Sequence, residues 1–125
     1  MQGLHLTADL HQCRCDAGWL TNAQRLGERC VQAVEAAGLT CVAQLFHAFP
    51  STDLGVSGVT ATVLLAESHL CVHTWPEQQA VTLDVYVCNF GGDHSAKAQA
   101  LMDTLVAVFE PLKVTCNALQ RGQIV

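Results

Sequence analysis

The amino-acid sequence predicts an α+β two-layer sandwich, in which an antiparallel sheet carries two helices on one face. Stretches of alternating apolar residues cluster between two stretches of helical periodicity, instead of alternating with them one by one. We expect the order β-α-β-β-β-α-β. The chain of 125 residues is long enough for one core, and no linker, repeat or low-complexity segment divides it. Residues 1–125 are therefore expected to form a single domain.

The first strand and helix are predicted from their periodicity. Alternation of apolar and more polar residues over 4–10 is typical of a half-buried strand. Thr21 is expected to cap the first helix, with Gln24 three residues later, and Gly38 to end it. The apolar positions of this helix are Leu26, Cys30, Val34 and Ala37.

The remaining elements follow in the same way. Strands are predicted over 39–49, 58–66, 69–75 and 81–87, and a last strand over 112–119. Asp93 is expected to cap the second helix. The buried stripe of that helix is predicted to consist of Ala98, Leu101, Met102, Leu105 and Phe109.

Composition excludes several classes of function. Half of the residues are hydrophobic and the net charge is −5 with six Lys and Arg, which argues against nucleic acid as a partner. No apolar run has the length of a membrane span, and no basic segment precedes an apolar one at the N-terminus. We expect a cytoplasmic protein without a membrane partner. The seven cysteines match no disulfide or zinc framework, and in a reducing compartment most would be small buried hydrophobes.

Reactive side chains are concentrated between Glu67 and Glu77. In an extended segment Glu67, His69, Cys71 and His73 share one face. Such a face can bind a metal, but structural zinc sites usually pair their ligands across turns at short spacing and the chain has no Cys-x-x-Cys pair, so no metal site is expected. A serine hydrolase is a second possibility, although Ser68 lacks the glycine-flanked elbow of those enzymes. A strand with ordinary hydrogen-bonded histidines is the third.

Four motifs in order resemble the prokaryotic S-adenosylmethionine decarboxylases. The motifs are Gly55-Val56-Ser57-Gly58, Ala66-Glu67-Ser68-His69-Leu70, His73-Thr74-Trp75-Pro76-Glu77 and Asp84-Val85-Tyr86-Val87-Cys88. The segments His5-Leu6-Thr7-Ala8-Asp9 and Phe46-His47-Ala48-Phe49 are similar to the same family. The resemblance implies a pyruvoyl-dependent decarboxylase of polyamine biosynthesis, which converts S-adenosylmethionine to its decarboxylated form and carbon dioxide. It also implies a homodimer with sites near the interface.

A pyruvoyl cofactor agrees with the chemistry of such a reaction. Decarboxylation at an α-amino carbon leaves an electron pair that ordinary side chains cannot accept, whereas a ketone condensed with the substrate amine can. Pyridoxal phosphate would need a suitable lysine. Lys97 and Lys113 are the two lysines of the chain, and neither lies in a convincing position.

The resemblance also implies a role for each motif residue. The chain would cleave itself between Glu67 and Ser68 into fragments of 67 and 58 residues, and Ser68 would become the pyruvoyl group. His73 would act as the base of this cleavage with help from Ser57, and Cys88 would reprotonate the substrate carbon during turnover. In substrate binding, Phe49 would stack on the adenine and Glu77 would hold the ribose hydroxyls. The roles of His69 and Cys71 stay open.

The chain departs from the family pattern where substrate specificity would lie. Five residues, 50–54, stand where about three are expected, Gln78-Gln79-Ala80 replaces a Tyr-Gly-Tyr type of sequence, and Asn89-Phe90 follows Cys88 instead of glycine. Arginine or ornithine is therefore an alternative substrate, with Asp53 as the partner of its distal cation. A non-catalytic regulatory relative is a further alternative, but it would have no reason to keep Ser57, Ser68, His73 and Cys88 together.

Overall fold

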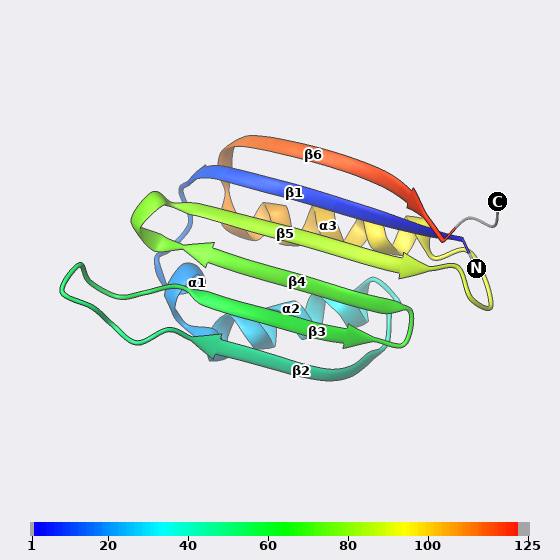
Figure 1. The fold of residues 1–125 in the computed structure, drawn as a ribbon, viewed down its shortest axis with the longest axis horizontal. Helices are drawn as coiled ribbons and strands as arrows, with labels where there is room; N and C mark the ends of the chain where they lie inside the picture. Colours follow the sequence, from blue (N-terminus) through cyan, green and yellow to red (C-terminus); the bar gives the residue numbers. More distant parts are fainter. Residues whose placement is uncertain (1, 123–125) are drawn as a thin grey trace.

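One antiparallel sheet of six strands, with all helices on one of its faces, makes up the computed structural model, which describes residues 2–122 (Figure 1). The predicted α+β two-layer sandwich is thereby confirmed. The spatial order of the strands is β2-β3-β4-β5-β1-β6. The strands are β1 (Gly3–Cys13), β2 (Cys41–Ala48), β3 (Val59–Leu65), β4 (Ser68–Trp75), β5 (Ala80–Cys88) and β6 (Pro111–Arg121). The helices are α1 (Gly18–Thr21), α2 (Ala23–Ala36), α3 (Ser95–Phe109) and the 3₁₀ turn η1 (Pro76–Gln78).

The observed order of elements differs from the expected order in two places. Four strands, not three, lie between the long helices, because each of the four alternating segments pairs as a strand of its own. The short helix α1 was not expected. It contains Thr21, so the predicted cap is one position too early: the side chain of Asn22 accepts the hydrogen bond from the backbone N–H of Arg25.

The second predicted cap is also displaced. Asp93 accepts a hydrogen bond from the backbone N–H of Ser95, but the residue that caps α3 is His94. A short Asx-type turn therefore precedes the helix, because the Asp93 carboxylate bonds a backbone group two residues further along the chain.

The core lies between the helices and one face of the sheet. Helix α3 packs against β1 and β5, and α2 packs against β2 and β3. The buried stripe predicted for α3 is confirmed in full. In β4, Leu70 and Val72 are buried, so the strand alternation directs His69, Cys71 and His73 to the opposite face.

Within residues 2–122 no helix covers this opposite face, which we call the open face (Figure 1). By strand alternation and register, its apolar side chains include Leu45, Leu64, Trp75 and Leu119, all of them exposed. No helix in the described range 2–122 is long and apolar enough to cross a membrane.

Candidate active site

Ser68 begins β4 in an unusual backbone conformation. It pairs with Leu65 across a turn formed by Ala66 and Glu67, and its φ is 153°. Favoured two-residue hairpin turns place positive φ values within the turn, on residues such as Gly or Asn. Here the positive φ lies on the serine that follows. A residue with a side chain in this region costs on the order of 1–3 kcal/mol, and such strain is concentrated at functional sites.

The residue before Ser68 is held at two points. The carbonyl oxygen of Glu67 accepts a hydrogen bond of 2.8 Å from the backbone N–H of Cys88. The side-chain Oε1 of Glu67 accepts a second hydrogen bond of 3.0 Å from the backbone N–H of Thr40. The peptide bond between Glu67 and Ser68 is thus fixed in position, and its carbonyl is polarised by a backbone donor.

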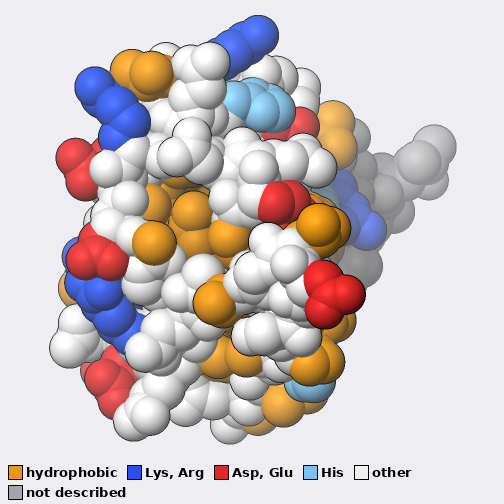
Figure 2. Space-filling model, turned by 90° about the vertical axis from the view of Figure 1, so that its left-hand side faces the viewer, with side chains coloured by type: hydrophobic (Ala, Val, Ile, Leu, Met, Phe, Trp, Pro, Cys, Tyr) orange, Lys and Arg blue, Asp and Glu red, His pale blue; other side chains and the backbone are white. Residues whose placement is uncertain are grey.

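A pocket of about 470 Å³ lies at the other end of the same strands. Phe49, Ser57, His73, Trp75 and Glu77 line it. Figure 2 views the molecule from this end and shows hydrophobic side chains exposed across it, with a few acidic ones among them. The lining contains the carboxylate of Glu77 but no Lys or Arg among the described residues.

Two contacts shape this pocket. Gly58 lies so close to the backbone of β4 that a Cβ there would collide with the carbonyl oxygen of Thr74, and the close approach carries Ser57 to the pocket wall. Nδ1 of His73 lies 2.8 Å from the hydroxyl of Thr60, its cross-strand partner. When Nδ1 carries the ring proton, it donates a hydrogen bond to the hydroxyl oxygen of Thr60. Nε2 then keeps the lone pair that a base needs.

The predicted site residues therefore form two half-sites. Glu67, Ser68 and Cys88 lie at one end of the sheet, and the second half-site, at the other end, contains Ser57 and His73. Ser68 and His73 are five positions apart in β4, a distance of about 17 Å along an extended strand. A single copy of the chain does not bring the serine and the histidine together.

The other predicted binding residues all lie near the pocket. Phe49 and Glu77 belong to its lining. Asp53 lies at the exposed tip of the 52–55 turn, where Thr52 and Gly55 exchange two backbone hydrogen bonds. Its carboxylate is not part of the lining.

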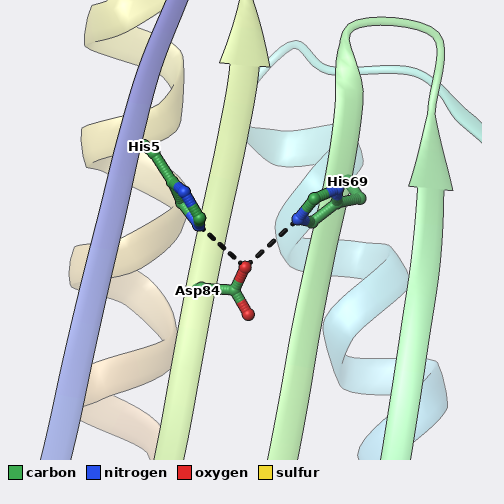
Figure 3. A group of neighbouring side chains, drawn as sticks. All are labelled: His5, His69 and Asp84. Carbon is green, nitrogen blue, oxygen red and sulfur yellow. Dashed lines mark hydrogen bonds and ion pairs between the residues drawn. The ribbon is translucent and has the colours of Figure 1, made fainter. Parts of the chain in front are cut away.

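A polar cluster on the open face escaped the sequence analysis as a group (Figure 3). Oδ2 of Asp84 lies 2.9 Å from Nε2 of His5 and 3.1 Å from Nε2 of His69. His5 lies in β1, Asp84 in β5 and His69 in β4. The strand register brings them together, because His5 and His69 each pair with Tyr86 of β5, from the strands on either side of it. Local sequence spacing contains no signal for such a cluster, because register joins its members.

The residue types of the cluster are those of a metal site, but its hydrogen bonds are those of a histidine–carboxylate hydrogen-bond network. The donor atoms of His5, His69 and Asp84 lie within 4.8 Å of one another. A guanidinium nitrogen of Arg121 also lies 3.0 Å from Nδ1 of His5. The guanidinium can only donate, so Nδ1 of His5 accepts this hydrogen bond. The ring proton is therefore on Nε2, which donates a hydrogen bond to Asp84. A histidine bound to a metal through Nε2 instead needs an acceptor at Nδ1.

The thiols next to the cluster and in the core behave as packing groups. Burial raises the pKa of the Cys71 thiol, and the nearby Asp84 carboxylate raises it further. Burial raises the pKa of Cys13 to about 11 and that of Cys30 to about 12. These thiols are uncharged at neutral pH and poor nucleophiles. All seven cysteines are free, which agrees with the absence of a disulfide framework in the sequence.

Fold and site together define an α+β protein in which a strained serine starts a strand and a cysteine amide holds the carbonyl before it. A family model described as S-adenosylmethionine decarboxylase matches residues 4–122. The chain belongs to this family.

Individual relatives agree with that membership. The S-adenosylmethionine decarboxylase proenzyme of Aquifex aeolicus is 37% identical over 96% of this chain and 81% of its own length. The corresponding proenzyme of Picrophilus torridus is 35% identical over 96% of this chain and 84% of its own length. The crystal structure of the adenosylmethionine decarboxylase from Aquifex aeolicus superimposes with a TM-score of 0.82, at 34% identity, over 98% of this chain and 92% of that one.

Proposed function

We propose that this protein is a self-processing, pyruvoyl-dependent decarboxylase that converts S-adenosylmethionine to its decarboxylated form and carbon dioxide. One observation carries the proposal: the carbonyl of Glu67 receives the N–H of Cys88 directly beside the strained backbone of Ser68. The name proenzyme, shared by the relatives, supports a chain that matures by cleavage. We place the reaction in cytoplasmic polyamine biosynthesis.

Cleavage begins when the hydroxyl oxygen of Ser68 attacks the carbonyl carbon of Glu67. The charge that develops on the carbonyl oxygen is stabilised by the N–H of Cys88. The C–N bond breaks, the amine of Ser68 is released, and an ester joins the two residues. A base then removes the α-proton of Ser68, Glu67 leaves as a carboxylate, and water displaces ammonia to give a ketone at the new N-terminus. We assign His73 as the base and Ser57 as its assistant.

The residues around Ser68 fit a pyruvoyl group. Ser68 and Cys88 are both half-buried, with neighbouring backbones, so the group would form beside a thiol. When present, the ketone binds the substrate amine and accepts the electron pair left by carbon dioxide. Cys88 is assigned as the proton donor to the substrate carbon, because a thiol at this place can deliver a proton without a second group.

A homodimer would unite the two half-sites. We propose that two copies pack with their open faces together, about a two-fold axis that runs across the strands and passes over β4 between Leu70 and Cys71. This arrangement would bring Ser68 of one copy opposite His73 of the other. The exposed apolar side chains of the open face support it, because an isologous contact would bury them on both copies.

The pocket favours S-adenosylmethionine over arginine or ornithine. Its lining offers the aromatic rings of Phe49 and Trp75 beside the carboxylate of Glu77, a combination suited to a base and ribose hydroxyls. A guanidinium or ammonium group would need a desolvated carboxylate partner, and Asp53 lies outside the lining. A non-catalytic role is not favoured, because the carbonyl of Glu67 next to Ser68 is already anchored by the backbone N–H of Cys88.

The test combines cleavage and turnover. On a denaturing gel the purified protein should give fragments of 67 and 58 residues, and the C-terminal fragment should resist Edman degradation because a ketone replaces its amine. Release of carbon dioxide is then measured from S-adenosylmethionine, arginine and ornithine in parallel. Intact chains that still decarboxylate would refute the pyruvoyl group, and activity confined to arginine or ornithine would refute the substrate.

A further inference from the structure

Phe90 is a large apolar side chain that the fold leaves almost fully in solvent. It lies in the loop from β5 to α3 and is 86% exposed. Burial of a phenylalanine ring is favourable, so an exposed ring two positions from Cys88 is a candidate contact residue.

The loop holds Phe90 in a defined place. The backbone N–H of Asn89 donates to the carbonyl of Gln2 at 2.7 Å, and the side chain of Asn89 accepts from the N–H of His94 at 3.0 Å. The ring of His94 returns to the carbonyl oxygen of Phe90, with Nε2 at 3.2 Å. Three hydrogen bonds thus fix the backbone on both sides of Phe90 while its ring stays uncovered.

Phe90 must lie near the reaction wherever Cys88 does. They are two positions apart in the sequence, so their Cα atoms are at most about 7 Å apart. In the proposed function Cys88 acts at a site that is completed by His73 of a second copy. The ring of Phe90 therefore arrives at the pocket end of that second copy.

That end of the molecule has an uncovered apolar rim. Leu54 is 96% exposed, Val56 is 61% exposed and Phe49 is 48% exposed, and all three line the pocket. We propose that Phe90 of one copy covers this rim on the other copy and forms a wall of the substrate pocket against the apolar part of S-adenosylmethionine. Phe90 would then be a specificity-determining residue supplied in trans. The inference rests on the proposed function.

A crosslinking experiment tests the contact without reference to activity. p-Benzoylphenylalanine is introduced at position 90, the purified unlabelled protein is mixed and exchanged with ¹⁵N-labelled wild-type protein, and the sample is irradiated. Mass spectrometry should find crosslinks from position 90 to residues 49–58 of the other isotopic form. The same amino acid at position 112, on the edge strand β6 and 58% exposed in the native chain, is the matched control. Crosslinks within one copy, or none to residues 49–58, would overturn the inference.

Kinetics test the role in specificity. Phe90→Ala should cleave itself like the wild type and raise the Michaelis constant for S-adenosylmethionine about tenfold, with kcat within about twofold, since uniform binding energy is lost. Phe90→Leu should recover part of the affinity, and Leu112→Ala should behave as the wild type. An unchanged Michaelis constant in Phe90→Ala would overturn the inference. A wild-type protein without decarboxylase activity would instead refute the proposed function, and the crosslinking result alone would then decide whether Phe90 contacts the other copy.

Discussion

The backbone N–H of Cys88 donates a hydrogen bond of 2.8 Å to the carbonyl oxygen of Glu67. This bond joins the last residue of β5 to the turn that precedes β4. In the proposed cleavage this oxygen would take up the negative charge that develops when Ser68 attacks, and the hydrogen bond would need no rearrangement at that moment. The proposed cleavage is therefore prepared by main-chain geometry within one copy, while in our proposal the base is supplied by His73 of a second copy.

Glu67 should act through its anchor and not through its charge. Glu67→Ala removes the hydrogen bond to the N–H of Thr40, so the carbonyl of residue 67 loses one of its two fixed points and cleavage should slow about tenfold or more. Glu67→Gln keeps an oxygen acceptor and should cleave nearly as fast as the wild type. Both rates are followed on denaturing gels. Equal slowing of the two variants would show that the carboxylate charge matters instead.

Cys88→Ala should separate cleavage from turnover. The variant keeps the backbone N–H that polarises Glu67, so fragments should still form, at least in part. It lacks the thiol, so carbon dioxide release should fall by 100-fold or more, in line with the loss of a general acid worth about 10²–10⁴. Gel analysis and carbon dioxide release are measured on one preparation. Turnover like that of the wild type would place the proton donor elsewhere.

Two inactive variants should restore each other in a mixed dimer. Ser68→Ala keeps His73, and His73→Ala keeps Ser68, so a mixed pair contains one complete site if the half-sites meet across copies. Each variant alone should stay uncleaved, whereas co-expression with separate tags should yield fragments from the chain that carries Ser68. No fragments from a purified mixed dimer would contradict assembly of the site in trans.

Asp84→Asn should disturb the polar cluster without any metal effect. An amide oxygen can still accept a hydrogen bond, but the variant loses the negative charge of the carboxylate oxygen that both Nε2 atoms of His5 and His69 contact. His69 directly follows Ser68 in the sequence, so a shift of its ring would reach the cleavage site. Cleavage should slow several-fold, and a chelator should change neither the variant nor the wild type. Inhibition by chelator, with recovery on adding zinc, would favour the metal interpretation of this cluster.

Stability should fall at alkaline pH partly because of Cys30. Burial raises the pKa of this thiol to about 12 from the ordinary 9.0. The folded state thus holds the proton more tightly than the unfolded state, and the free energy of unfolding should decrease as pH rises from about 9 towards 12. Denaturant titrations of Cys30→Ala should show a shallower decrease above pH 9, after a loss of roughly 1 kcal/mol at neutral pH. An identical pH dependence would exclude Cys30 as a source.

The sequence by itself determined the elements and the motifs of this protein. Alternation along β4 and the helical stripe that includes Met102 and Phe109 are local patterns, because they depend on the periodicity of one segment. The sequence predicts the cap of α2 one residue early, since Thr21 and Asn22 are both good caps and the structure has Thr21 inside α1, with its hydroxyl hydrogen-bonded to the carbonyl of Ala17.

Tertiary structure decided what these residues meet. Periodicity does not specify the register between strands, and register joins His5, Asp84 and His69 on three strands and sets Cys88 against Glu67. The motifs that contain Ser68 and His73 adjoin in the sequence, yet an extended strand moves them about 17 Å apart. Residues that are close along the chain are thereby separated, because β4 is straight and its length exceeds the reach of any side chain.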